Sequence, residues 1–210
     1  MKQIDTIIWD WNGTLLDDVH ISLSSVNQLL AEKNLEILTH ERYLDLFTFP
    51  VQKYYESIGF DFDSEPFEIT AHRFIEIYNE SARDFGLYSE VMPVLECLKA
   101  KGLKQFILSA MEQQLLEETV RQNNIFTYFD AVYGLNHQYA TSKIEIGINL
   151  ITQNNLSPCQ TLLIGDTLRD FEVAQFIGCQ CILVAKGHQS RKRLESTGAK
   201  VIDNLSELRI

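Results

Sequence analysis

Five short apolar segments are spaced along the chain, and stretches with helical periodicity lie between most of them. Each segment is rich in isoleucine, leucine or valine, which is typical of strands buried on both faces. This alternation predicts an α/β fold, a Rossmann-like parallel sheet with helices on both faces. The predicted strands are Thr6–Trp9, Gln105–Leu108, Ala131–Tyr133, Thr161–Ile164 and Cys181–Val184.

Capping residues mark the helices between these strands. A helix is expected over Leu168–Ile177, with Gly178 as its stop signal. Ser142 and Glu145 match the capping-box pattern, which predicts a further helix with Lys143 at its start. Behind this cap, three isoleucines are expected on one helical face: Ile144, Ile148 and Ile151.

One connection is longer than the others. About seventy residues separate the first strand from the next predicted helix, too many for a single crossover. Apolar residues recur with helical period around Leu23–Leu30 and again around Phe67–Tyr78. We therefore predict a small inserted all-helical cap domain at residues 19–85, and a core domain of residues 1–18 and 86–210. The hinges are expected near Asp17–Asp18 and Phe85–Ser89.

Charge and composition narrow the possible functions. The formal net charge of −11 argues against a general nucleic-acid binder, because phosphate backbones require a basic surface. No apolar stretch approaches the roughly 20 residues of a membrane span, and the charged N-terminus does not resemble a signal peptide. The four cysteines are consistent with reduced thiols. We expect a cytoplasmic protein, monomeric or homodimeric, without a nucleic-acid or membrane partner.

Polar residues that could take part in catalysis or binding follow several of the predicted strands. Asp10 follows the first strand, Ser109 the second and Asp166 the fourth, and Lys143 begins the helix after the third. In an open parallel sheet, ligands bind at the carboxyl ends of the strands, so these side chains are expected to meet at one edge. Hard carboxylate oxygens suit Mg²⁺, and a hydroxyl and an ammonium group suit a phosphate.

The order and spacing of these segments resemble the four motifs of the haloacid dehalogenase superfamily. The segments are Asp10–Asp17, Ser109-Ala110, Lys143 and Gly165–Asp170. The resemblance covers nearly the whole chain, and the inserted helices are similar to the small cap of that superfamily. The tail Leu183–Ser190 resembles its phosphoglycolate phosphatase branch.

The resemblance implies roles for individual residues. Asp10 would be the nucleophile that forms an aspartyl-phosphate. Mg²⁺ would be held by Asp10, Asp166 and the backbone carbonyl of Asn12, with Asp170 as a further ligand or as a carboxylate behind the ligands. Covalent catalysis of this kind splits hydrolysis into two displacements. Taken alone, Asp170 would equally suit the first turn of a helix, where an acid favours the helix dipole.

The same resemblance places the phosphate. Ser109 and the N–H of Ala110 would hold its oxygens, and Lys143 would balance the charge of the nucleophile and the phosphoryl group. The substrate would be a small phosphorylated metabolite whose organic part the cap selects. Three cap residues are candidates for that selection, although surface exposure is the better expectation for each: Lys53, His72 and Arg73.

One position departs from the phosphatase pattern of the superfamily. Asn12 stands where an aspartate would protonate the leaving group and then deprotonate water, and a neutral amide does neither. Loss of general acid–base catalysis costs on the order of 10²–10⁴-fold in rate. A phosphatase would tolerate Asn12 through water, through another acid such as Asp17, through a cap residue, or through a substrate with a good leaving group.

Two further interpretations remain beside a phosphatase. The pattern of Asp10–Thr14 is similar to that of phosphonoacetaldehyde hydrolases, which use a Schiff-base lysine in the cap, and Lys53 is available for that role. Alternatively, the chain is a binding or regulatory protein that keeps a Mg²⁺ and phosphate pocket with little turnover. Mg²⁺-dependent phosphomonoester hydrolysis is the favoured activity because the chain retains all the other motif residues: Asp10, Ser109, Lys143, Asp166 and Asp170.

Overall fold

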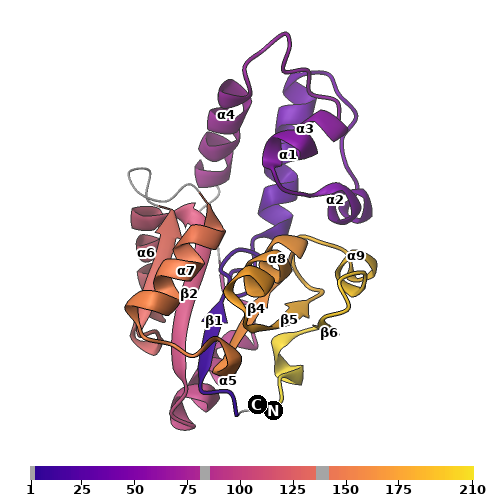
Figure 1. Cartoon of the computed structure of the whole chain (residues 1–210). Helices are drawn as coiled ribbons and strands as arrows, with labels where there is room; N and C mark the ends of the chain where they lie inside the picture. Colours follow the sequence, from indigo (N-terminus) through magenta and orange to yellow (C-terminus); the bar gives the residue numbers. More distant parts are fainter. Residues whose placement is uncertain (1–2, 81–85, 136–141) are drawn as a thin grey trace.

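A computed structural model describes residues 3–80, 86–135 and 142–210, and within them it confirms the predicted α/β fold. All strand pairs are parallel, and the strand order is β3-β2-β1-β4-β5-β6 (Figure 1). The strands are β1 Thr6–Trp9, β2 Lys104–Glu112, β3 Ala131–Leu135, β4 Thr161–Gly165, β5 Gln180–Val184 and β6 Lys200–Ile202. The chain runs outward from β1 in both directions, so β1 and β4 flank the point where the strand order reverses.

Helices cover both faces of the sheet because successive strand residues point to opposite sides. Ile7 and Trp9 pack with helices α5 and α6, whereas Ile8 packs with α7 and α8. The helices of the described residues are α1 Val19–Glu32, α2 His40–Leu46, α3 Val51–Ser57, α4 Phe67–Glu80, α5 Val91–Ala100, α6 Gln113–Gln122, α7 Lys143–Gln153, α8 Leu168–Ile177 and α9 Arg191–Glu195. Within the described ranges, no helix is both long enough and apolar enough to cross a bilayer.

Four of the five predicted strands extend beyond their predicted bounds, and a sixth strand was missed. β2 does not end at Leu108 but continues to Glu112, with a shift in its register against β3. Ser109 therefore lies inside the strand rather than after it. β6 was not predicted, because its three residues include an exposed lysine and carry almost no periodic signal.

Helix α7 begins at Lys143, as predicted, and the Ser142 hydroxyl accepts a hydrogen bond from the Glu145 N–H at 3.3 Å. The predicted apolar face is wrong in one respect, because Ile148 is 47% exposed. Ile146 and Leu150 form the buried face instead. Helix α8 ends as predicted at Gly178, which adopts a left-handed conformation with φ of 80°.

Four helices lie between β1 and α5 in the described residues 19–80, at the carboxyl end of the sheet (Figure 1). They surround a hydrophobic cluster of their own, which includes Leu30, Tyr54 and Ile77. Helices α1 and α4 match the predicted periodic segments, whereas the seven-residue helices α2 and α3 are too short to show a clear period. Phe85, where the second hinge was placed, lies outside the described residues. Below, the helices α1–α4 are called the cap.

The cap contacts the core through the segment that contains α2. Backbone oxygens at its end accept hydrogen bonds from the loop after β5 and from α9. Ser190 donates its N–H to Leu44 at 3.1 Å, and Gln189 donates from its side chain to the carbonyl of Phe47 at 2.8 Å. Arg193 donates to both carbonyls. These bonds hold this side of the cap over the carboxyl end of β5.

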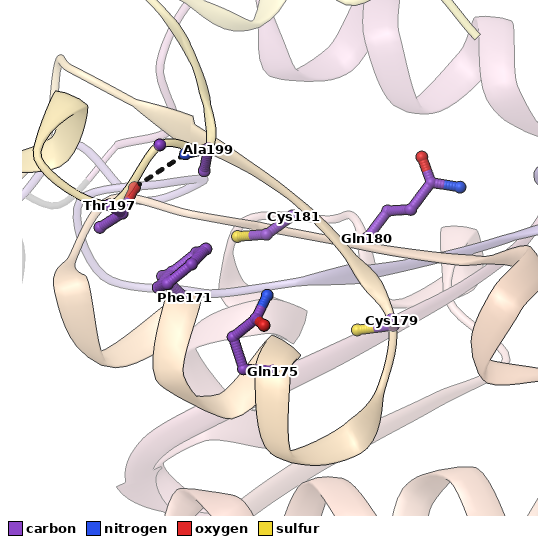
Figure 2. Close-up of a pocket in the computed structure, with 8 residues that line it drawn as sticks. Phe171, Gln175, Cys179, Gln180, Cys181, Thr197 and Ala199 are labelled. Atoms are coloured by element: carbon purple, nitrogen blue, oxygen red, sulfur yellow. Dashed lines mark hydrogen bonds between the residues drawn. The ribbon is translucent and has the colours of Figure 1, made fainter.

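A surface pocket of about 390 Å³ lies beside α8, β5 and the turn before β6 (Figure 2). Its lining includes Phe171, Gln175 and two of the cysteines, and none of the candidate catalytic residues. All four cysteines are free thiols, as expected. Burial raises the pKa of the Cys179 thiol to about 11 and also raises the pKa of the Cys181 thiol, so both remain protonated at neutral pH.

Candidate active site

The structure brings the predicted acids together at the carboxyl ends of β1 and β4. Asp10 directly follows β1, and its N–H donates to the carbonyl of Ile164 in β4 at 2.8 Å. Asp166 directly follows β4, and Asp170 lies in the first turn of α8. All three side chains are buried, with at most 7% of each residue exposed. One carboxylate oxygen from each lies within 4.8 Å of the others, so the cluster has the spacing of a cation site.

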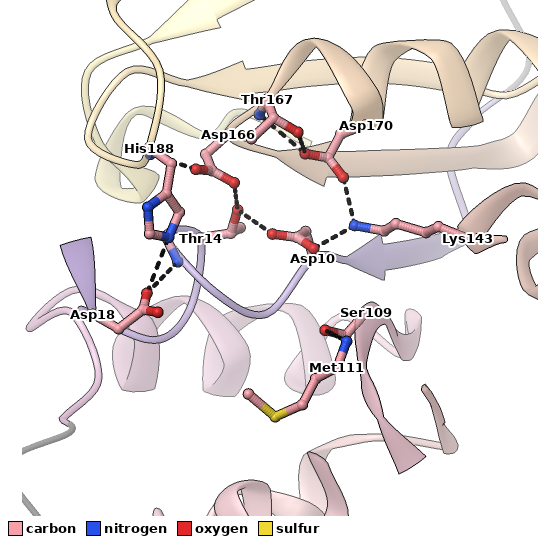
Figure 3. Close-up of polar contacts among 11 residues, drawn as sticks. Asp10, Thr14, Asp18, Ser109, Met111, Lys143, Asp166, Thr167, Asp170 and His188 are labelled. Carbon is pink, nitrogen blue, oxygen red and sulfur yellow. Dashed lines mark hydrogen bonds and ion pairs between the residues drawn. The ribbon is translucent and has the colours of Figure 1, made fainter. Parts of the chain in front are cut away.

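Lys143 provides the positive charge of this site. Its ammonium group forms ion pairs with Asp10 and, at 2.6 Å, with Asp170 (Figure 3). The lysine is buried at the first position of α7. Burial opposes its charge, but the two carboxylates outweigh burial and raise the pKa of Lys143, which stays protonated. The site therefore combines one fixed cation with three acids.

The acids carry more negative charge than Lys143 compensates. Burial raises the pKa of Asp10 to about 6, although the ammonium group of Lys143 acts in the opposite direction. Burial also raises the pKa of Asp166 well above its usual range, and the carboxylates of Asp10 and Asp170 add to this effect. A bound divalent cation would remove this penalty, because it would neutralise carboxylates that burial deprives of water.

The surroundings of Asp166 hold its carboxylate in place and pack closely against it. The Thr14 hydroxyl lies 3.2 Å from both Asp10 Oδ2 and Asp166 Oδ1, and the His188 N–H donates to Asp166 Oδ2 at 2.6 Å. Gly13 and Gly187 pack directly against this carboxylate, where any side chain would collide with it. Hard oxygen donors held in this way fit Mg²⁺ better than a soft metal ion.

We expect Gly187→Ala to damage the site, because a methyl group there collides with Cβ, Cγ and Oδ2 of Asp166. Overpacking of this kind costs about 1–3 kcal/mol of unfolding free energy, and displacement of Asp166 should weaken metal binding at least tenfold. Gly86→Ala is the matched control, since a Cβ at Gly86 has no heavy atom within 4 Å. Urea unfolding and Mg²⁺ titration would measure both effects, and equal behaviour of the two variants would contradict this packing argument.

The predicted phosphate-binding residues lie on β2, the strand next to β1. Ser109 is buried, and its hydroxyl oxygen accepts the Met111 N–H at 3.1 Å, whereas Ala110 is exposed. This bond orients the hydroxyl oxygen and leaves the hydroxyl proton to be donated. The register shift of β2 occurs between Leu108 and Glu112, so this segment departs from the regular ladder where the phosphate was expected.

Asp170 has two uses in the structure. Its Oδ1 pairs with Lys143, and its Oδ2 accepts hydrogen bonds from the N–H and the hydroxyl of Thr167 at 3.0 and 2.6 Å. The second use caps the N-terminus of α8, where a negative charge also favours the helix dipole. Asp170 can therefore cap α8 and contribute negative charge to the site at the same time, although the sequence left these two roles as alternatives.

Asn12 faces the cap rather than solvent alone. Its side-chain Nδ2 lies 2.8 Å from Asp18 Oδ2 and 3.0 Å from the hydroxyl oxygen of Tyr78 in α4. Asp18, not Asp17, is the acid that contacts the amide, and it is only 1% exposed. From the sequence, Asp18 was expected at a hinge and was given no role in the site. The available signal was its position immediately before α1, where it follows the loop that carries Asp10 and Asn12.

His188 is a further site residue without a role assigned from sequence. Its Nε2 lies 3.3 Å from Asp18 Oδ1, and its Nδ1 shares a 2.7 Å hydrogen bond with the hydroxyl of Tyr43 in α2. Burial opposes its charge, but the carboxylate of Asp18, followed by those of Asp166 and Asp10, raises the pKa of His188 to about 9. Burial also works against the charge of Asp18, yet His188 holds the pKa of Asp18 below its usual value.

The His188 pair predicts a pH dependence of stability in the metal-free protein. A histidine with a raised pKa stabilises the fold fully below its unfolded pKa of about 6.5 and loses this contribution as pH rises through about 9. The loss amounts to at most about 3 kcal/mol. His188→Gln should abolish this part of the decline, measured by urea unfolding between pH 6.5 and 9.5. An unchanged decline in the variant would contradict the assignment.

The three cap residues that were candidates for substrate selection show no contact with the site within the described residues. Lys53 and His72 are exposed, and Arg73 forms ion pairs with Glu32 and Glu76 on the cap surface. The cap instead presents tyrosines toward the core, with Tyr43 and Tyr78 bonded to His188 and Asp18. The positions of these three residues therefore do not support a role in recognising the organic part of a ligand.

The fold and site identify the class of protein. Residues 7–184 match the family model of the haloacid dehalogenase-like hydrolases, so the chain belongs to this hydrolase family. The chain is similar to a phosphoglycolate phosphatase of Aliivibrio fischeri, with 21% identity over 97% of this chain and 93% of that protein. A phosphoglycolate phosphatase of Aquifex aeolicus is 26% identical over 87% of this chain and 85% of its own length.

Solved structures show the same fold. The crystal structure of a predicted phosphatase from Clostridium acetobutylicum superposes with a TM-score of 0.79 at 19% identity, covering 98% of this chain and 96% of that one. A haloacid dehalogenase-like hydrolase from Streptococcus pneumoniae gives a TM-score of 0.71 at 19% identity, with 96% and 94% of the two chains covered. The likeness extends over the cap as well as the sheet.

Proposed function

We propose that this hydrolase is a Mg²⁺-dependent phosphomonoesterase of the phosphoglycolate phosphatase type. The observation that carries the proposal is the buried group of Asp10, Asp166, Asp170 and Lys143 at the point where the strand order reverses. Three acids and one ammonium group at such a place are suited to a phosphate dianion and a divalent cation. The names of the two similar phosphatases support the same activity. The substrate would be a small phosphorylated metabolite.

Asp10 acts as the nucleophile in this proposal. One of its carboxylate oxygens attacks phosphorus, the bond to the leaving oxygen breaks, and an aspartyl-phosphate forms. Water then attacks the same phosphorus, which releases inorganic phosphate and restores the carboxylate. The Lys143 ammonium group, paired with Asp10, reduces the repulsion between the carboxylate and the phosphoryl oxygens. The Ser109 hydroxyl and the Ala110 N–H hold phosphoryl oxygens from the β2 side.

Mg²⁺ would be held by carboxylate oxygens of Asp10 and Asp166 and by the backbone carbonyl of Asn12. Asp170 would add its charge from behind, because its two oxygens already accept from Lys143 and Thr167. When bound, Mg²⁺ supplies positive charge that offsets the accumulation of anions at the phosphoryl group. The remaining polar groups around Asp166, described above, keep its carboxylate oriented for this purpose.

Metal removal tests the proposal directly. The purified chain should release phosphate from p-nitrophenyl phosphate when Mg²⁺ is present. Treatment with EDTA should reduce this release at least 100-fold, and added Mg²⁺ should restore it. Phosphoglycolate is assayed in parallel as the substrate named for the similar proteins. Release that is unaffected by EDTA would contradict the proposal.

Other outcomes would favour the alternatives. Mg²⁺-dependent binding of phosphate analogues without turnover would indicate a binding or regulatory protein. Borohydride trapping of phosphonoacetaldehyde on Lys53 would indicate a phosphonate hydrolase, although Lys53 is exposed on α3 and no contact joins it to Asp10 within the described residues. The geometry therefore favours the phosphatase over the C–P bond hydrolase.

A further inference from the structure

The side chain of Asn12 is fixed by two acceptors that use both of its N–H groups. Nδ2 donates to Asp18 Oδ2 at 2.8 Å and to the hydroxyl oxygen of Tyr78 at 3.0 Å. The Tyr78 hydroxyl in turn donates to Asp18 Oδ2 at 2.6 Å. These three groups close a ring of hydrogen bonds, and this ring fixes which end of the amide is nitrogen. The amide oxygen Oδ1 is the only atom left for a ligand, and it can only accept a hydrogen bond.

The groups behind this ring are also hydrogen-bonded to one another. Asp18 Oδ1 accepts from the Gly13 N–H at 2.9 Å and faces His188 Nε2 at 3.3 Å. The other ring nitrogen of His188 is bonded to the Tyr43 hydroxyl. Figure 3 shows Asp18 and His188 linked in this way on the far side of Thr14 from Lys143. Among the described contacts, both N–H groups of Asn12, the hydroxyl hydrogen of Tyr78 and both ring nitrogens of His188 are used within this network, so none of these three side chains directs a hydrogen to a leaving oxygen.

Other nearby groups do not replace a proton donor. The ammonium group of Lys143 is paired with Asp10 and Asp170, where it holds the nucleophile. The hydroxyls of Thr14 and Ser109 are aliphatic alcohols, which are no stronger as acids than the alcohol that an alkyl phosphate would release. In the described part of the chain, the site therefore stabilises the phosphoryl group but offers the leaving oxygen no proton.

We propose that the substrates of this enzyme are phosphate compounds whose leaving group departs as a stable anion, such as acyl or aryl phosphates, rather than alkyl phosphates. This inference rests on the proposed phosphatase function and narrows its substrates, because phosphoglycolate is itself an alkyl phosphate and would be a poor substrate of this enzyme. In the first displacement, an Asp10 oxygen bonds to phosphorus while the electron pair of the breaking P–O bond leaves with a carboxylate or phenolate. No proton is transferred in that step. Water then hydrolyses the aspartyl-phosphate, and its protons pass to phosphate and solvent.

Asp18 is the positioning residue that enforces this preference. An aspartate at position 12 would place a second carboxylate against Asp18 Oδ2, which now accepts from the Asn12 amide at 2.8 Å. Two carboxylates that close repel each other. Asn12→Asp alone is therefore not expected to create a well-placed proton donor. Exchange of the two groups, in Asn12→Asp/Asp18→Asn, retains one acid and one amide in the same ring and puts the acid at position 12.

The test measures how strongly the rate depends on the leaving group. The second-order constant kcat/KM is measured with Mg²⁺ for dinitrophenyl, nitrophenyl, phenyl and ethyl phosphate and for acetyl phosphate. The ratio of kcat/KM for nitrophenyl phosphate to kcat/KM for ethyl phosphate should be larger in the wild type than in the exchange variant. The difference should be about 10²–10⁴-fold, the usual contribution of general acid catalysis. Asn12→Ala should lower rates without changing this ratio. Asp203→Asn, an exposed Asp-to-Asn change, is the matched control.

The outcomes separate the inference from the function on which it rests. Turnover of ethyl phosphate at nearly the nitrophenyl rate in the wild type would overturn the inference and leave the phosphatase function intact. Absence of turnover for every compound in the series would overturn both. The rate ratios of the wild type and of Asn12→Ala are sufficient to decide whether the enzyme discriminates against ethyl phosphate. The inference can therefore be tested even if the exchange variant fails to fold. The mass of the peptide containing residue 12 confirms that each preparation carries the intended amide or acid.

Discussion

Asp10→Asn should abolish phosphate release, with a loss on the order of 10⁴-fold or more in kcat. The amide keeps the size of the carboxylate but has no anionic oxygen to attack phosphorus. The loss should appear in kcat rather than in folding, because burial, with a smaller contribution from Asp170, raises the pKa of Asp10 to about 6, and an uncharged amide removes a carboxylate whose charge burial disfavours. The change also relieves Asp166, whose pKa is raised by burial and further by the Asp10 carboxylate. Steady-state assays with nitrophenyl phosphate and urea unfolding would measure the two quantities.

Phosphoryl trapping provides an independent check of the same variant. Wild-type protein quenched in acid during turnover should carry one additional phosphoryl group on the peptide that contains Asp10, and Asp10→Asn should carry none. Asp203→Asn, which alters an exposed carboxylate in an ion pair with Arg191, should behave like the wild type in both assays. Residual turnover of Asp10→Asn within tenfold of the wild type would exclude Asp10 as the nucleophile.

Lys143→Met should have the largest effect on stability. Its ammonium group is buried between Asp10 and Asp170, and removal of one partner from a buried ionic group costs about 3–5 kcal/mol. The loss should be smaller at pH 5 than at pH 7. Burial already raises the pKa of Asp10 to about 6, so protonation of the native state below that pH removes the charge that Lys143 would otherwise compensate.

Urea unfolding of metal-free protein at the two pH values would measure this difference. Lys186→Met is the matched control, because Lys186 pairs with Glu90 at the surface and its side chain is 40% exposed. Surface pairs contribute at most about 1 kcal/mol, so the control should lose little at either pH. A pH-independent loss in Lys143→Met, or a loss equal to that of the control, would contradict the charge argument.

Local sequence signals were sufficient to predict the site residues that directly follow a strand or begin a helix. Trp9 in β1 pairs in register with Ile164 in β4. Because two neighbouring parallel strands end at the same edge of the sheet, the residues that follow them lie close together. Asp10 and Asp166 were predictable for that reason. The position of Lys143 was predictable because Ser142 is the N-terminal capping residue of α7 and fixes where that helix begins.

The ring around Asn12 could not be predicted in the same way. Tyr78 is 60 positions from Asp18 in the chain, and His188 is 145 positions from Tyr43. These distances are closed only by the packing of the cap on the core, which depends on many weak contacts rather than on a periodic pattern. The short helices α2 and α3 and the strand β6 were missed because three to seven residues contain too few repeats to define a period.

Two tyrosines of the cap, Tyr43 and Tyr78, connect the position of the cap to the geometry of the site. Tyr43 and Tyr78 come from different cap helices, and both end on the Asp18–His188 pair, while α1 begins directly after Asp18. A swing of the helices away from the sheet would break both contacts at once and remove the Tyr78 acceptor of the Asn12 amide, while the bond from Asn12 to Asp18 remains. In an open form that admits substrate, this amide would therefore be held by one acceptor instead of two. The orientation of the Asn12 amide is thus coupled to the position of the cap.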